Sequence, residues 1–149
     1  MANERWSSFP NGGPLQAGDI LVGIRAGVNE QFIAPVFESN FVVVTTPTQA
    51  MLSNTTYIVN DPTSLVTFTL PSASAVNDRL SIVGVSTGGW IITQGNSQQI
   101  QVSPSSTTLG LPGSLASTNQ YDSLNLICIV ANTIWSAIGG GQTQGFTYI

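Results

Sequence analysis

The sequence predicts an all-β fold, an antiparallel β-sandwich or a jelly-roll-like barrel. Many short apolar or alternating stretches are separated by Gly, Pro and Asn, which favour turns. No window of about a dozen residues shows the apolar spacing of an amphipathic helix. Only 7% of the residues are charged, and Ser, Thr, Asn and Gln fill roughly a third of the chain. A hydrophobic content of 42% over 149 residues suffices for the core of one domain.

The first strands are expected at residues 20–25, 31–37 and 41–45. Turn-forming pairs at 26–27 and 39–40 separate them. Two more follow at 55–60 and 65–70, divided by the turn sequence Asp61-Pro62-Thr63-Ser64. In the second of these, apolar residues alternate with threonines, as a half-buried strand requires.

The second half of the chain is expected to form hairpins. Residues 79–85 and 90–94 flank a Ser-Thr-Gly-Gly turn, and residues 98–102 pair back on 90–94. The best-defined hairpin joins 123–131 to 134–138.

Within the last hairpin, the run Ile127-Cys128-Ile129-Val130 is apolar on both faces. It predicts a central strand covered on both sides, with Leu126, Cys128 and Val130 on one layer and Ile127 and Ile129 on another. A neighbouring subunit could supply the second cover. Cys128 has no second cysteine for an intrachain disulfide, and it is expected to be a small buried hydrophobe rather than a nucleophile, because no histidine exists to activate it.

The chain is expected to divide into three parts. Residues 1–40 are an extended strand-turn-strand segment, residues 41–138 are the sandwich core, and residues 139–149 are a Gly-rich tail. The tail ends on an apolar Phe-Thr-Tyr-Ile sequence, which is expected to dock on this chain or on another subunit.

Composition argues against several function classes. There is no histidine and no lysine, so the usual proton carriers and nucleophile activators of enzymes are missing. A net charge of −4 argues against nucleic acid, and no apolar run approaches the roughly 20 residues of a membrane span. Asp61, Asp78 and Asp122 lie in three different turns, so no metal site or cofactor is predicted.

Six residues are candidates for contacting a ligand, which would be a sugar bound by stacking and by hydrogen bonds to its hydroxyls. They are Trp90, Asn96, Gln98, Asn119, Tyr121 and Asp122. Each also has a purely structural use. Trp90 shares a strand face with apolar neighbours and fits a core, Asp122 can cap backbone amides with Tyr121 packed beneath, and Asn96 and Gln98 fit a solvated hairpin tip.

The segment GDILVGIRAGVNEQF at 18–32 resembles a short strand-turn-strand element of bacteriophage tail fibre and virion proteins. The rest resembles the C-terminal domain of the same virion surface proteins. The matching motifs are NTTYI at 54–58, LVTFTLP at 65–71, GGWII at 88–92, STNQYD at 117–122 and LICIVANTIW at 126–135.

This resemblance implies a place on the virion surface and a homotrimer. The expected function is a non-enzymatic fibre or spike tip that binds a host-surface receptor, a glycan, with the N-terminal segment attaching to other virion proteins. One alternative is a capsid-decoration protein with a mechanical role. A glycan depolymerase is a remote alternative, because such enzymes need paired carboxylates around a cleft.

Overall fold

The computed structural model describes residues 20–25, 28–33, 40–138 and 146–149, and for the first two ranges only the backbone. The chain divides into two compact units, Met1–Glu38 and Ser39–Ile149. In the first unit, β1 (Ile20–Arg25) pairs antiparallel with β2 (Val28–Ile33). The expected first strand is confirmed, whereas the second begins earlier than expected. The turn expected at 26–27 lies outside the described residues.

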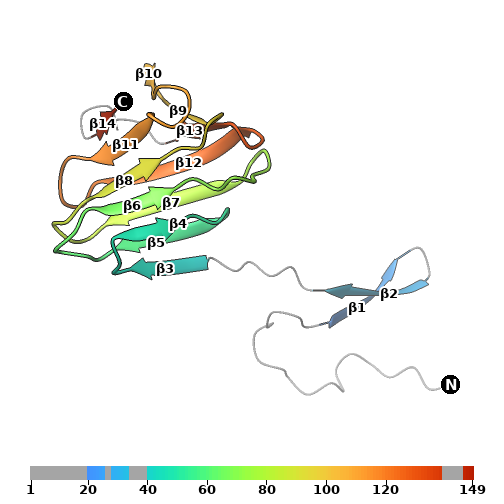
Figure 1. The fold of residues 1–149 in the computed structure, drawn as a ribbon. Coiled ribbons are helices and arrows are strands. Elements are labelled where there is room, and N and C mark those ends of the chain that lie inside the picture. The colour runs from blue at the N-terminus through green and yellow to red at the C-terminus, as the bar shows by residue number, and fades with distance from the viewer. Residues whose placement is uncertain (1–19, 26–27, 34–39, 139–145) are drawn as a thin grey trace. The chain divides into compact units, whose positions relative to one another are not determined.

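The second unit consists of two β-sheets that lie face to face (Figure 1). The larger sheet contains, in spatial order, β10 (Ser105–Ser106), β9 (Gln99–Val102), β13 (Ile134–Ala137), β12 (Ser123–Val130), β7 (Arg79–Gly84), β5 (Thr55–Val59) and β3 (Asn40–Val44). The smaller sheet contains β14 (Phe146–Tyr148), β11 (Ser114–Ser117), β8 (Trp90–Thr93), β6 (Val66–Thr69) and β4 (Thr48–Ala50). The predicted all-β, sandwich-like fold is therefore confirmed. The described residues include no helix long and apolar enough to cross a membrane.

The sheets are mixed, which corrects the expectation of an antiparallel sandwich. From β3 to β8 the chain changes sheet after every strand, so β3, β5 and β7 run parallel in one sheet and β4, β6 and β8 run parallel in the other. The first half of the domain is thus wound as three successive two-strand turns (Figure 1). The hairpins expected between 79–85 and 90–94 and between 90–94 and 98–102 are wrong, because β7 and β9 lie in the sheet opposite β8.

Within the second half of the domain the strand pairs are antiparallel, except that β13 pairs parallel with β9. The predicted last hairpin is confirmed as β12–β13, with Leu126 opposite Ala137 and Cys128 opposite Trp135. The C-terminal strand β14 pairs with β11, so residues 146–148 belong to the smaller sheet, in keeping with a tail that docks.

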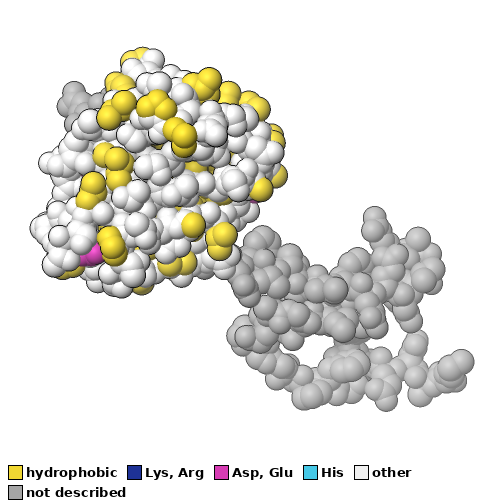
Figure 2. Space-filling view, viewed as in Figure 1, with side chains coloured by type: hydrophobic (Ala, Val, Ile, Leu, Met, Phe, Trp, Pro, Cys, Tyr) yellow, Lys and Arg dark blue, Asp and Glu magenta, His cyan; other side chains and the backbone are white. Residues whose placement is uncertain are grey.

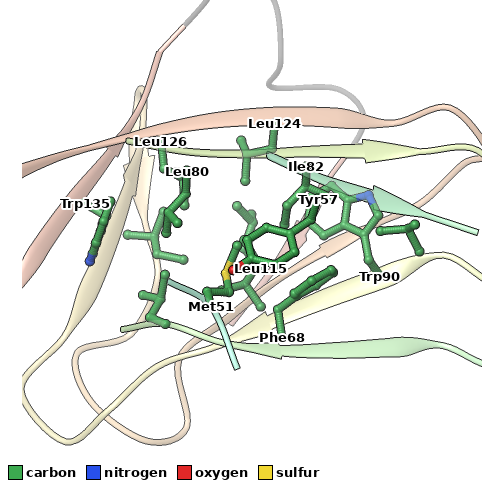
Figure 3. Close-up of a cluster of buried hydrophobic side chains, with 14 of the residues drawn as sticks. Met51, Tyr57, Phe68, Leu80, Ile82, Trp90, Leu115, Leu124, Leu126 and Trp135 are labelled. Atoms are coloured by element: carbon green, nitrogen blue, oxygen red, sulfur yellow. The ribbon is translucent and has the colours of Figure 1, made fainter. Parts of the chain in front are cut away.

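The core lies between the sheets and contains two aromatic pairs and a separate tryptophan (Figure 3). Tyr57 and Phe68, from facing sheets, meet edge to face with ring centroids 5.3 Å apart. The ring centroids of Trp90 and Phe146 are 5.5 Å apart. In Figure 3, Trp135 lies at the end of the cluster opposite Trp90. Alternation places these side chains inward, because every second residue of a strand points to the same face.

The outer face of β12 is not covered within the described chain. Leu126 and Cys128 face the core as expected, but Ile129 is 41% exposed and Val130 is also exposed. The pairing register of β12 with β13 shifts between Cys128 and Val130, and this irregularity turns Val130 out of the core layer. The expectation that Val130 is buried is therefore wrong. The second cover expected over Ile127 and Ile129 is not provided by the residues described.

The side chain of Asp61 stabilises the turn between β5 and β6 through hydrogen bonds. Its Oδ1 accepts hydrogen bonds from the Thr63 backbone N–H at 2.9 Å, the Thr63 hydroxyl at 2.8 Å and the Ser64 N–H at 3.1 Å. These bonds lower the pKa of the Asp61 carboxyl below its ordinary value of 3.8, and the bond from the Thr63 N–H has the largest effect.

We expect this carboxyl to make the protein acid-sensitive. Because the folded-state pKa is lowered, the stabilisation is complete above pH 3.8 and is lost as the pH falls through the folded pKa. Denaturant unfolding between pH 2 and pH 7 should show a smaller acid-induced loss of stability for Asp61→Asn than for wild type. An equal loss in both proteins would show that Asp61 is not responsible.

Candidate functional site

The candidate site is the loop of residues 118–122 that joins β11 to β12, here called the Tyr121 loop. The Asp122 carboxylate organises it: Oδ2 accepts from the backbone N–H of Thr118 and of Asn119, each at 2.8 Å. The Asp122 N–H donates to the Asn119 carbonyl at 3.4 Å. The loop is therefore a tight turn closed by its own side chain, as expected for Asp122 in its structural use.

Contacts from beneath and from the side hold this loop on the sandwich. The Trp90 indole Nε1 donates to the Asp122 carbonyl at 3.1 Å, and the Gly84 N–H donates to the same oxygen at 3.0 Å. The Gln120 side-chain amide donates to the Val85 carbonyl at 2.9 Å. Trp90 itself is 0% exposed, so its ring cannot stack on a ligand in this fold. Its role is to position the loop.

Tyr121 stands out in both exposure and backbone conformation. Its side chain is 68% exposed, so it does not pack beneath the turn. Its φ of 70° lies in the left-handed region, which is unfavourable for a side chain with a Cβ. Among the described residues other than glycine, positive φ occurs at Tyr121 and at three asparagines, Asn54, Asn77 and Asn132. Asparagine tolerates this conformation because its short side chain can bond locally, whereas tyrosine gains nothing comparable.

The other candidate residues lie at the opposite end of the domain. Asn96 is exposed in the turn after β8, and Gln98 is buried just before β9. The Gln98 amide donates to the Pro71 carbonyl at 2.7 Å and to the Asn132 carbonyl at 3.4 Å. Asn132 follows β12 and Asp122 precedes it, so the eight residues of β12, roughly 26 Å long, separate the two groups. The structure thus brings together Trp90, Asn119, Tyr121 and Asp122 but not Asn96 and Gln98.

A second surface feature is an open hollow of about 390 Å³ beside β9 and β10. Its lining consists of Gln101, Ser103, Pro104, Ser105, Ser106 and Ser136. Hydroxyl and amide groups line it, and none of these side chains is charged. It can exchange hydrogen bonds with a hydroxyl-rich ligand, but it lacks an aromatic ring for stacking.

The carboxylates of the described domain accept hydrogen bonds within the turns in which they lie. Asp61 and Asp122 accept bonds from their own loops, as described above. Asp78 accepts from the Ala75 N–H at 2.9 Å and from the Asn54 side-chain amide at 3.1 Å. Within the described ranges, no three Cys, Asp or Glu side chains gather as metal ligands. The face shown in Figure 2 has little charged surface: hydrophobic groups are scattered among other side chains and backbone, and only a small acidic area is visible on it.

Comparison with known proteins adds no further guide to the site. No family model and no curated protein matches this chain. The exposed residues of the chain itself are therefore the guide to its function.

Proposed function

We propose that this chain is a non-enzymatic virion structural protein, a trimeric fibre or spike tip that binds a host-surface glycan through the Tyr121 loop. The observation that carries the proposal is Tyr121 itself. An exposed aromatic side chain at a left-handed backbone position stabilises neither the core nor the turn. Such departures from local preference concentrate at functional sites.

The chemistry of the loop suits a sugar. A tyrosine ring offers a flat apolar face for stacking on a pyranose, and its hydroxyl can hydrogen-bond. Asn119 lies beside it on the same turn, exposed, with a carboxamide that suits sugar hydroxyls. The loop is preorganised by the bonds to Asp122, so little conformational entropy is lost on binding.

Binding without cleavage fits the distribution of acids. Glycan hydrolysis requires two carboxyl groups on either side of the scissile bond. In the Tyr121 loop the one carboxylate, that of Asp122, accepts two backbone N–H bonds. One such site binds weakly, and three sites on a particle-bound trimer would raise the apparent affinity through effective concentration.

The test uses fluorescently labelled full-length chain applied to cells of a permissive host. We expect Tyr121→Asn to reduce cell-bound label at least tenfold, because it removes the ring. Its unfolding free energy should stay equal or rise, because asparagine tolerates the positive φ. Tyr148→Asn is the matched control, since Tyr148 is also exposed but lies in β14, and it should bind like wild type.

Three outcomes would contradict the proposal. Equal binding by wild type and Tyr121→Asn would remove the loop from the site. Release of new reducing ends from the glycan would make the chain an enzyme. No binding to any permissive host, together with tight binding to emptied capsids, would identify a capsid-decoration protein instead.

A further inference from the structure

The Tyr121 loop has the backbone geometry of an anion-binding site. The N–H groups of Thr118 and Asn119 converge on one oxygen, Asp122 Oδ2, and each donates to it at 2.8 Å. Successive backbone N–H groups that converge in this way form a concavity suited to an anion. Here the anion is the loop's own Asp122 carboxylate, so these two donors are already taken and cannot receive an anionic group of a ligand.

No basic residue of the described domain lies near that carboxylate. Within residues 40–138 and 146–149 the single basic side chain is Arg79, at the start of β7. The N–H that bonds to the Asp122 carbonyl belongs to Gly84, at the other end of β7. The strand between them is roughly 17 Å long, about twice the screening length at physiological ionic strength. The remaining charges of the chain, four acids and two arginines, lie in residues 1–38.

The carboxylate is close to the groups proposed to contact the sugar. Asp122 Oδ2 is 2.8 Å from the backbone nitrogen of Asn119, whose side chain is one of these groups. Tyr121, which supplies the ring, directly precedes Asp122 in the chain. A carboxylate, phosphate or sulfate on the ligand would therefore meet a like charge at short range. It would also lose hydration without gaining a cationic partner from the described residues.

We infer that the Tyr121 loop selects neutral glycans, whose sugars carry no carboxylate, phosphate or sulfate, and that Asp122 causes this selectivity. The inference rests on the proposed glycan binding and adds to it the chemical class of the sugar. Sugar hydroxyls need only hydrogen bonds, which the uncharged side chains of Asn119 and Tyr121 can exchange. Asp122 thus both holds the loop together and excludes anionic ligands.

The test compares one glycan with and without charge. Glycan from a permissive host is separated by anion exchange, and part of the neutral fraction is oxidised at its primary hydroxyls to carboxylates. Both forms are titrated into the isotope-labelled full-length chain. At about 10 mM salt, where screening is weak, we expect the oxidised form to bind at least about threefold less tightly. The difference should shrink as the salt rises to about 0.15 M.

Asp122→Asn separates the charge from the structure of the loop. Both backbone N–H bonds end on one oxygen, so an amide oxygen in the same place can accept both. In this variant the affinities for the oxidised and neutral forms should become nearly equal. Asp78→Asn is the matched control, because it changes the net charge by the same amount but lies just before β7, at the end opposite Gly84. The wild-type ratio of affinities should persist in it.

Each other outcome decides the question. If wild type binds the oxidised form, or the acidic fraction of the host glycan, as tightly as the neutral form, the inference is overturned while glycan binding stands. If Asp122→Asn keeps the wild-type ratio, or if Asp78→Asn loses it, Asp122 is not the cause of the selectivity. If Asp122→Asn does not fold, the salt dependence of the wild-type ratio still tests the repulsion. If wild type binds neither form, the proposed function fails and the inference fails with it.

Discussion

Replacing Gln94 with leucine is expected to lower the free energy of unfolding by about 3 kcal/mol or more. The Gln94 side chain is buried, and its Nε2 donates to the carbonyls of Gln98, Thr108 and Gly110 at 2.9, 2.9 and 3.1 Å. Its Oε1 accepts from the buried Thr107 hydroxyl. Leucine would leave the Thr108 carbonyl without its hydrogen bond, and a buried unpaired polar group costs about 1–3 kcal/mol. It would also remove one bond each, worth about 1 kcal/mol, from the Gln98 and Gly110 carbonyls and from the Thr107 hydroxyl, although these keep bonds to Gly110, Gly113 and Ile100. Chemical denaturation of the two proteins measures the difference.

Gln101→Leu is the control for this experiment. Gln101 is an exposed glutamine of β9, so its replacement should change the unfolding free energy by less than about 0.5 kcal/mol. A loss below about 1 kcal/mol for Gln94→Leu would mean that other donors replace its amide. The buried network at this end of the domain would then not be an essential structural element.

The second large effect is expected for Gly88→Ala, which should cost about 3 kcal/mol. A Cβ on Gly88 would overlap the backbone carbonyl oxygens of Asp61 and Ser64. Neither atom belongs to a flexible side chain, so the turns after β5 and β7 would have to separate. That movement would also strain the bond from the buried Ser86 hydroxyl to the Asp61 carbonyl, 2.8 Å long.

Gly95→Ala provides the comparison, because the three heavy atoms nearest to a Cβ there all belong to the side chain of Gln98, the nearest at 3.1 Å. Its cost should be clearly smaller than that of Gly88→Ala. Thermal unfolding of both variants gives the ranking. Equal stability of Gly88→Ala and wild type would show that the two turns are not packed as closely as described.

The positions of most longer strands could be predicted from the sequence, whereas their pairing partners, apart from those of the last hairpin, could not. Turn residues mark where the chain reverses direction, and they do so equally when the next strand returns in the same sheet and when it crosses to the opposite one. The Ser-Thr-Gly-Gly sequence after β7 therefore predicts a hairpin, whereas in the structure β8 lies in the opposite sheet. The winding also leaves no visible repeat: Asn40, Thr55 and Leu80 align across the sheet at unequal spacings in the sequence.

The sequence does not predict the short strands that lack an apolar pattern. β4 and β11 have the sequences Thr-Gln-Ala and Ser-Leu-Ala-Ser, which carry little alternation to detect. Their place in the smaller sheet comes from long-range pairing with β6 and β8. Local sequence cannot indicate such pairing.

The candidate site could be predicted only in part. The polar loop of Asn119, Tyr121 and Asp122 was visible as a turn sequence, and Asp122 does cap it. The left-handed backbone of Tyr121 was not predictable, because tyrosine rarely adopts it. Gln98 looked like a solvated turn residue, yet its amide bonds to the carbonyl of Pro71, which is distant in sequence.

We propose that the Tyr121 loop binds a host-surface glycan without cleaving it, and this proposal can be tested directly. The most direct measurement is a titration of the isotope-labelled full-length chain with glycan purified from a permissive host, followed by the amide resonances. We expect reversible shifts concentrated at residues 118–122, no comparable shifts at 101–106, and an intact glycan afterwards. Shifts confined to residues 101–106, no shifts at all, or a shortened glycan would contradict it.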